Sequence, residues 1–336
     1  MAPSHLFSPV FLRLGGALVT ALALGHTAAA QTSNQTANWP DRAIRIISAY
    51  GPGAAPDIGL RRISVDLAKA LGQPVIIDPR PGAGGRIAAA EAAKAAPDGY
   101  TFAFSDSGPI VVLPATGAKL GYNVEKDFVP VVRMAHSFPY LVVPTGSAAQ
   151  NVGDLKNLGR TPTFGLSGLG TYPHVICLMA AQAAGFACNP IPYSKGTSAA
   201  LMDVAAGTID LGIGWGAEMQ GLIEGRKIRI LATMAPRRTT PYPNVPTVAE
   251  FFPAAESLAV FTGIFAPSGT PAPVVERLRA EVNKVMLSGA FRAWVESSGG
   301  DVNTIETLEG TGFAQFLDKQ RIVIKAIADA YGLKSE

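Results

Sequence analysis

The chain has 336 residues, with 28 basic side chains (Lys and Arg) against 25 acidic ones, a formal net charge of +3 at neutral pH. A nucleic-acid-binding protein typically gathers basic residues on one face, and no run of Lys and Arg occurs here, so composition argues against that class. The chain is long enough for two lobes with a large apolar core.

The first thirty residues are predicted to be an export signal. Arg13 supplies a positive start, the apolar run LGGALVTALALG follows, and residues 27–30 (TAAA) supply the small side chains that signal peptidase requires. The apolar run is too short to span a bilayer as a helix. We expect cleavage after about Ala30 and a soluble periplasmic protein that begins at Gln31. An N-terminal anchor that is never cleaved is the alternative.

Three strands are predicted in the next segment. AIRIIS (43–48), VIID (75–78) and TFAFS (101–105) are apolar and rich in β-branched or aromatic residues. The first two are each followed by a loop rich in glycine and proline (50–57 and 79–85) and then by a helix. This alternation predicts a parallel sheet that binds ligands in the loops at the carboxyl ends of its strands.

A second series of strands and helices begins at residue 138. Strands are predicted at 138–144, 163–167, 189–193, 208–214 and 228–234, with helices that start near 151 or cover 175–184 and 199–206. Because strands and helices alternate again, we expect a second parallel-type sheet with its own strand-end loops.

The order of these segments favours two lobes that exchange strands. Lobe 1 is predicted to hold residues 40–132 together with 250–336, and lobe 2 residues 133–249. Two amphipathic helices, 273–286 and 313–332, should pack on lobe 1. Two lobes that face each other form a cleft, which could close on a small solute by hinge motion.

Cys177 and Cys188 are the 2 cysteines of the chain. In an oxidising compartment they could form a disulfide that ties a helix to the strand after it. The alternative is a pair of buried thiols that pack as small apolar groups. The pair is not spaced as CxxC, and no other metal motif is present, so neither a metal site nor thioredoxin-like chemistry is expected.

Two loops place bare backbone at the start of a helix. Gly53, Ala54 and Ala55 precede Asp57, which we expect to be a helix N-cap, and the loop 168–173 leads into the cysteine helix. The first N–H groups of a helix have no partners inside it, and the helix dipole attracts anions. Each loop is therefore predicted to bind an anion, a carboxylate or a phosphate, and two such loops that face each other suit a solute with a carboxylate at each end. A plain tight turn is the alternative for the first loop.

These segments resemble one known family, in the same order and with the same spacing. RPGAGG (80–85), AAPDGYTF (95–102), GLSGLGTYPH (165–174), NVPTVAE (244–250) and FAPSGTPAPVVERL (265–278) are similar to the Bug family, the periplasmic receptors of tripartite tricarboxylate transporters. The resemblance implies an α/β fold of the two-lobed periplasmic-binding-protein kind (type II), with two mostly parallel sheets and a ligand cleft between the lobes. It implies a monomeric receptor that captures a mono- or dicarboxylate and delivers it to the membrane subunits of such a transporter.

In the family the ligand is held by the strand-end loops. Carried over to this chain, the resemblance implies a ligand-binding set of Gly53, Ala54, Ala55, Asp57, Ser167, Gly168, Gly170, Thr171, His174, Tyr193 and Ser198. We add Ser107, which stands where the family typically has asparagine, and Trp215, which could either wall the cleft or pack as an ordinary core residue. Pro56 departs from the family pattern, because it lacks the N–H and the hydroxyl of the usual threonine. The identity of the carboxylate is therefore left open.

Catalytic groups are scarce. His136 and His174 are the histidines that follow residue 30, and GLSGL (165–169) breaks the nucleophile-elbow pattern at Leu169. No phosphate loop or dinucleotide-binding motif is present, so neither an enzyme nor a cofactor is expected. Two alternatives stay open: a receptor that presents its ligand to a signalling membrane protein, and a periplasmic hydrolase that uses Ser167 and His174.

Overall fold

The first three predicted strands form one sheet with two strands from later in the chain. The computed structural model describes residues 38–169, 171–193, 196–235, 237–251, 260–297, 310–331 and 333, so the predicted export signal lies outside the described residues. Residues 42–336 form one compact unit, separate from residues 1–41.

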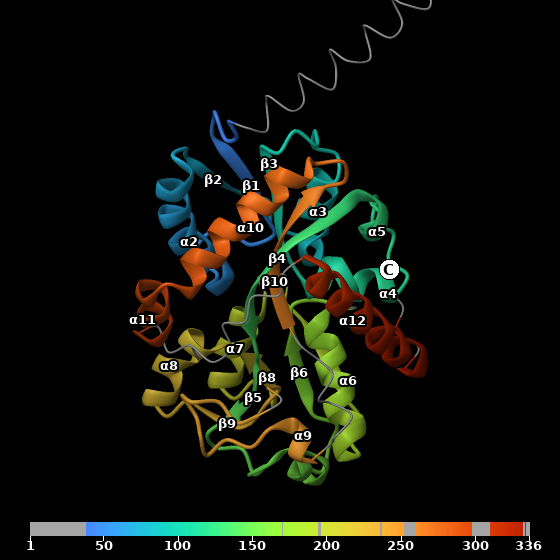
Figure 1. The fold of residues 1–336 in the computed structure, drawn as a ribbon. Helices are drawn as coiled ribbons and strands as arrows, with labels where there is room; N and C mark the ends of the chain where they lie inside the picture. The colour runs from blue at the N-terminus through green and yellow to red at the C-terminus, as the bar shows by residue number, and fades with distance from the viewer. Residues whose placement is uncertain are drawn as a thin grey trace, which may run out of the picture. The chain divides into compact units, whose positions relative to one another are not determined.

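The larger sheet has the strand order β2-β1-β3-β10-β4 (Figure 1). β1 (Ile44–Ser48) pairs in parallel with β2 (Val75–Pro79) and with β3 (Thr101–Asp106). β10 (Val260–Pro267) is antiparallel to both its neighbours, β3 and β4 (Phe128–Ser137). β4 therefore runs in the same direction as the first three strands, and the sheet is parallel except for β10.

The helix between β1 and β2 buries one face only. In α2 (Ala55–Leu71) the side chains of Ile63 and Leu67 are buried, whereas Ile58 and Val65 are 49% and 54% exposed. The buried positions lie four apart, on one side of the helix, as expected for a helix that covers a sheet. The apolar residues of this helix thus divide between a core face and a solvent face.

The second set of strands forms a three-stranded sheet, β8-β5-β9, and a two-stranded sheet, β6-β7, which a bridge joins and which together are called the second sheet below. β5 (Tyr140–Pro144) is antiparallel to β8 (Gly212–Gly214) and to β9 (Ile228–Thr233), while β6 (Thr163–Leu166) is parallel to β7 (Asn189–Pro192). A parallel bridge between Phe164 and Leu211 connects the two groups. Every strand of this set except β5 therefore runs in one direction. The mostly parallel arrangement is confirmed, with one antiparallel strand in each sheet.

One strand is shorter than predicted. The sequence favours a strand over 208–214, but β8 begins only at Gly212. Asp210 lies just before it, and its carboxylate accepts hydrogen bonds from Arg160 and from the backbone and hydroxyl of Thr163. The side chain of Asp210 thus adds to the connection with β6 that the backbone of Leu211 makes through hydrogen bonds with Thr163 and Gly165.

The remaining helices connect or cover these strands. They are η1 (Ala83–Gly85), α3 (Arg86–Ala92), η2 (Gly108–Val112), α4 (Leu113–Ala115), α5 (Val124–Asp127), η3 (Val152–Asn157), α6 (Tyr172–Ala184), α7 (Thr197–Ala205), α8 (Gly216–Glu224), α9 (Val248–Phe251), α10 (Ala272–Leu287), α11 (Gly289–Ser297) and α12 (Gly310–Tyr331). Among the described residues, none of the helices combines the length and the hydropathy that a membrane span requires.

Of the two cysteine alternatives, the structure contains the disulfide. Cys177 on α6 is bonded to Cys188, which directly precedes β7, and their Cα atoms are 6.2 Å apart. Cys177 is fully buried within the core. The bond ties the helix to the strand that follows it.

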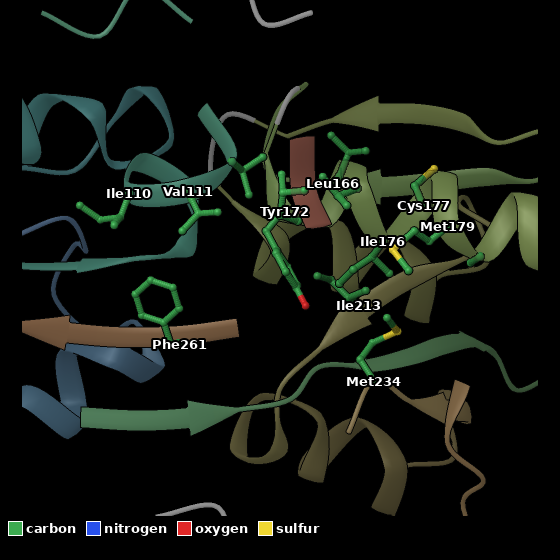
Figure 2. Packing of buried hydrophobic residues seen from close by; sticks show 14 of the residues in the cluster. Ile110, Val111, Leu166, Tyr172, Ile176, Cys177, Met179, Ile213, Met234 and Phe261 are labelled. Carbon is green, nitrogen blue, oxygen red and sulfur yellow. The ribbon is translucent and has the colours of Figure 1, made fainter. Parts of the chain in front are cut away.

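One apolar cluster contains residues of both sheets, and a second, smaller cluster lies around Val142 and Val204 in the second sheet and α7. Figure 2 shows Ile110 and Phe261, from η2 and β10, in the same cluster as Tyr172, Ile176 and Cys177 on α6. Of the two predicted C-terminal helices, α10 packs on α2 and β4 as expected, whereas α12 contacts α6 as well as β4 and η2. The predicted lobe boundaries, at residues 132/133 and 249/250, stay predictions.

Candidate functional site

The loop after β1 presents its backbone differently from the prediction. α2 begins at Ala55, with Ala54 as its N-cap and Pro56 in the first turn, so the prediction that Asp57 is the N-cap is wrong. Pro56 is the reason, because proline has no N–H and fits the first turn of a helix, which therefore starts before Asp57.

Asp57 is a buried carboxylate that is only half satisfied. Its side chain is 1% exposed, and Oδ2 accepts hydrogen bonds from the backbone N–H of Gly53 (3.0 Å) and from Nε of Arg61 (2.9 Å). Oδ1 is buried and has no hydrogen-bond partner. The N–H of Gly53 is therefore already used within the loop. The donors left at this helix start are the first-turn N–H groups of Ala55 and Asp57.

At the end of β3, the predicted residue Ser107 lies beside a carboxylate that the sequence analysis did not single out. Asp106 Oδ1 accepts the N–H of Gly108 (2.6 Å), and Oδ2 accepts the hydroxyl of Tyr50. Burial raises the pKa of Asp106, and these two hydrogen bonds only partly offset it. The available signal was an acid two residues before a glycine, a pattern typical of a side chain that closes a turn on its own backbone.

The hydroxyl of Ser107 itself has no partner. The residue is 3% exposed, and its Oγ is buried without a hydrogen bond. A buried polar atom without a partner costs about 1–3 kcal/mol, so such atoms are rare in proteins and call for an explanation. A bound ligand or an ordered water is the usual explanation at a strand end that faces a site.

The RPGAGG loop connects this strand end to the second sheet. A Cβ placed on Gly108 would lie 3.4 Å from the carbonyl oxygen of Gly84, and a Cβ placed on Gly84 would lie 3.5 Å from Cγ2 of Thr171. Gly84 also has a φ of 62°, in the left-handed region that favours glycine. The strand-end loops of the two sheets are therefore neighbours, with Gly84 between them.

The loop before α6 is held by its own hydroxyls. Oγ1 of Thr171 donates to the carbonyl of Gly168 (2.5 Å), and Ser167 donates to Oγ1 of Thr171 (3.4 Å). His174 is half-buried in the first turns of α6, and burial lowers its pKa. Gly170 lies outside the described residues. Ser167, Gly168, Thr171 and His174 thus form a small polar loop at a helix start, and their contact with a ligand stays a prediction.

Two further predicted residues lie at the neighbouring strand ends. The N–H of Tyr193 bonds to the carbonyl of Leu166 (2.8 Å), which places it beside the end of β6. Its hydroxyl donates to Asp203 (2.6 Å), and burial together with that carboxylate raises its pKa to about 12. Trp215 is the N-cap residue of α8 and packs, partly buried, against the shared core. That contact fits the core alternative, and its role in a cleft stays a prediction.

Ser198 leads to a second carboxylate that the sequence analysis missed. Ser198 is exposed, in the first turn of α7, and its side chain acts on Glu218 in the first turn of α8. Burial raises the pKa of Glu218, and the hydroxyl of Ser198 partly offsets this. Oε2 of Glu218 is buried without a partner. Among the described residues, no group of three or more His, Cys, Asp or Glu side chains is arranged to hold a metal ion.

The chain was compared with known protein families and with curated proteins. Residues 60–332 match the model of the tripartite tricarboxylate transporter family receptor. A UPF0065 protein of Bordetella bronchiseptica is 33% identical over 307 residues, which is 89% of this chain and 89% of that protein. Protein BugT of Bordetella pertussis is 31% identical over 258 residues, 75% of this chain and 78% of that protein.

Solved structures show the same fold. The R. palustris protein Rpa4515 with adipate is 27% identical, with a TM-score of 0.78 over 88% of this chain and 99% of that one. MatC from Rhodopseudomonas palustris with bound malate is 25% identical, with a TM-score of 0.75 over 86% of this chain and 99% of that one. The resemblance to the Bug family and the periplasmic-binding-protein fold are both confirmed. The chain therefore belongs to the tripartite tricarboxylate transporter family of receptors, as a periplasmic solute-binding receptor of the Bug type and not an enzyme.

Proposed function

We propose that this receptor captures a small mono- or dicarboxylate between two loop clusters, the strand-end loops of the first sheet and those of the second sheet. It then delivers the solute to the membrane subunits of a tripartite tricarboxylate transporter. The protein would act as a monomer, after export and cleavage near Ala30. The lobes would be residues 40–132 with 250–336 and residues 133–249, closing on the solute about the strands that pass between them.

The observation that carries this proposal is the buried, unpartnered hydroxyl of Ser107 beside loops from both sheets. A carboxylate can accept from that hydroxyl and from the first-turn N–H groups of Ala55 and Asp57 in α2. Two solved relatives contain malate and adipate, which are dicarboxylates. The remaining predicted residues, which include His174, Tyr193 and Trp215, would shape the rest of the site.

A thermal-shift screen tests the proposal. The purified protein, freed of copurified ligand by unfolding and refolding, is heated with mono-, di- and tricarboxylates and with amino acids. A ligand at a hundredfold excess over its Kd stabilises the folded state by about 2.7 kcal/mol, which is readily detected. One or a few carboxylates should raise the Tm, and a panel without any shift would contradict the proposal.

A pair of glycine variants shows where the solute binds. Gly84→Leu would fill the space between the loops next to Thr171, whereas Gly117→Leu adds its side chain where no atom lies within 4 Å. Both glycines have positive φ, so both variants carry a similar backbone strain of about 1–2 kcal/mol. We expect the ligand-induced shift to be lost in the first variant and kept in the second. Equal shifts in both would place the solute elsewhere.

A further inference from the structure

Glu218 has one oxygen that the fold leaves unsatisfied. The residue lies in the first turn of α8, which starts directly after the carboxyl end of β8. The hydroxyl of Ser198, from the first turn of α7, acts on this carboxyl group, while Oε2 is buried without a hydrogen-bond partner. The carboxyl group thus lies between two helix starts at the strand-end edge of the second sheet, where Ser198 and Trp215 were predicted to contact the solute.

The local structure gives Glu218 no role as a cap. An acid at the third position of a helix often accepts the N–H of the N-cap residue, as Asp154 does with Asn151 at the start of η3. The start of α8 has no such side-chain bond, and its N-cap is Trp215. No ion pair between described residues includes Glu218. A buried carboxylate oxygen without a donor is costly, because charged groups lose the most on leaving water.

We infer that Glu218 accepts a hydrogen bond from the bound solute, so that the solute is a carboxylate that also carries an N–H or O–H donor. This inference rests on the proposed function, in which backbone amides and Ser107 hold the solute's carboxylate. A second carboxylate placed against Glu218 would repel it, whereas an ammonium or hydroxyl group would satisfy Oε2. Glu218 would therefore determine specificity: it favours donor-bearing acids over plain dicarboxylates of the same length.

Two matched series of acids test the inference. Succinate, malate and aspartate share one carbon skeleton and differ in carrying hydrogen, hydroxyl or ammonium at one carbon; adipate, 2-hydroxyadipate and 2-aminoadipate form the longer series. Calorimetry measures the Kd of each acid for the ligand-free wild type and for Glu218→Gln. We expect the donor-bearing acids to bind wild type more tightly than the plain acid. In the variant they should lose roughly tenfold to a hundredfold in affinity, the range for a charge-assisted hydrogen bond, while the plain acid keeps or gains affinity.

Glu224→Gln is the matched control. Glu224 lies on the same helix and bonds to Gln220 (3.1 Å) on an exposed face, so its loss removes the same charge without touching the strand ends. All affinities should stay unchanged in this variant. If Glu218→Gln does not fold, Glu218→Asp makes the same comparison by withdrawing the carboxylate from the donor.

Several outcomes would overturn the inference and leave the proposed function standing. One is a wild type that binds the plain acids as tightly as the donor-bearing ones. Another is a Glu218→Gln variant that loses affinity equally for every acid of a series, because Glu218 would then act only on the structure of the protein. A wild type that binds none of the carboxylates in either series or in the wider screen would instead remove the proposed function itself.

Discussion

At the scale of single residues, Ser107 can be compared with Ser105 to test whether its hydroxyl contacts the solute. The two side chains are the same but lie at different positions relative to β3. Both hydroxyls are buried without a hydrogen-bond partner, but Ser105 lies inside β3 and Ser107 follows its end. Ser107→Ala should weaken binding of the identified carboxylate roughly threefold to tenfold, the loss of one hydrogen bond of about 0.5–1.5 kcal/mol. Neither variant should lower the Tm of the ligand-free protein, because each removes a polar atom that the fold does not pair.

Ser105→Ala is the control, and calorimetry is the measurement. Its affinity should equal that of the wild type. If both serine variants bind equally well, the hydroxyl of Ser107 does not contact the solute.

The residues that sequence analysis missed are those whose role depends on a distant partner. Ser107 and Thr171 could be proposed from the sequence, because the resemblance to the Bug family marks their positions and the local pattern of strand, small residues and helix identifies a strand-end loop. Asp106 and Glu218 could not. Asp106 matters because Tyr50 reaches it from another loop, and Glu218 because Ser198 lies on another helix. Asp57 is a wrong prediction from the local pattern. The pattern predicted a helix N-cap at Asp57, but Pro56 fits the first turn, so the helix starts before Asp57.

At the scale of elements, Asp210 ties the start of β8 to β6. Its Oδ2 accepts the N–H (2.9 Å) and the hydroxyl (2.8 Å) of Thr163, and Arg160 donates to both oxygens. Burial alone would raise the pKa of Asp210, but the hydrogen bonds from Arg160 and Thr163 outweigh it, so the pKa lies below its usual value. The carboxylate form is therefore the form that stabilises the fold.

The stability that the carboxylate of Asp210 contributes should fall as the pH falls. A group whose pKa is lower in the folded than in the unfolded state adds stability above its unfolded value, here 3.8, and loses it as the pH falls through the folded value. Asp210→Asn should lower the free energy of unfolding at pH 7 by about 1–3 kcal/mol. The difference from wild type should shrink as the pH falls below 3.8. Urea unfolding at pH 7 and at pH 3 measures both effects.

Asp329→Asn is the control for this experiment. Asp329 pairs with Lys325 on the surface of α12, and its side chain is 66% exposed. A surface ion pair of this kind contributes less than about 1 kcal/mol, so this variant should unfold nearly as the wild type does. An Asp210 variant that behaves like the Asp329 variant would mean that the strand connection does not depend on the carboxylate.

The type of many elements could be predicted from the sequence, but the strands β4 and β10 were not predicted, and the neighbours of a strand could not be. Most of the strands that were predicted exist, because β-branched runs between glycine- and proline-rich loops have few other solutions. β10 enters between β3 and β4, although it follows β4 by more than a hundred residues. The pairing of β10 with β3 and β4 is determined by packing, because the local sequence pattern of β10 does not indicate which strands lie beside it. β8 was also predicted too long, because its pairing with β5 covers only Gly212–Gly214.

At the scale of residues 42–336, the chain passes from the first sheet to the second and back. These crossings can couple the loop cluster of one sheet to that of the other. The chain leaves the first sheet through β4 and enters the second as β5, its one antiparallel strand. It later returns through β10, the one antiparallel strand of the first sheet. α12 contacts elements of both sheets. A solute that touches both clusters should therefore restrain both sheets together.

Hydrogen–deuterium exchange tests this coupling. With the identified carboxylate at a hundredfold excess over its Kd, exchange through global opening should slow about a hundredfold. The strand-end segments 53–58, 105–108 and 166–169 should gain additional protection in parallel across a titration, because the solute would close both loop clusters at once. The opposite ends of the strands, such as residues 97–100, serve as the internal control. They should gain only the protection that comes from slower global opening. Protection confined to the segments of one sheet would mean that the solute binds one loop cluster without drawing in the other.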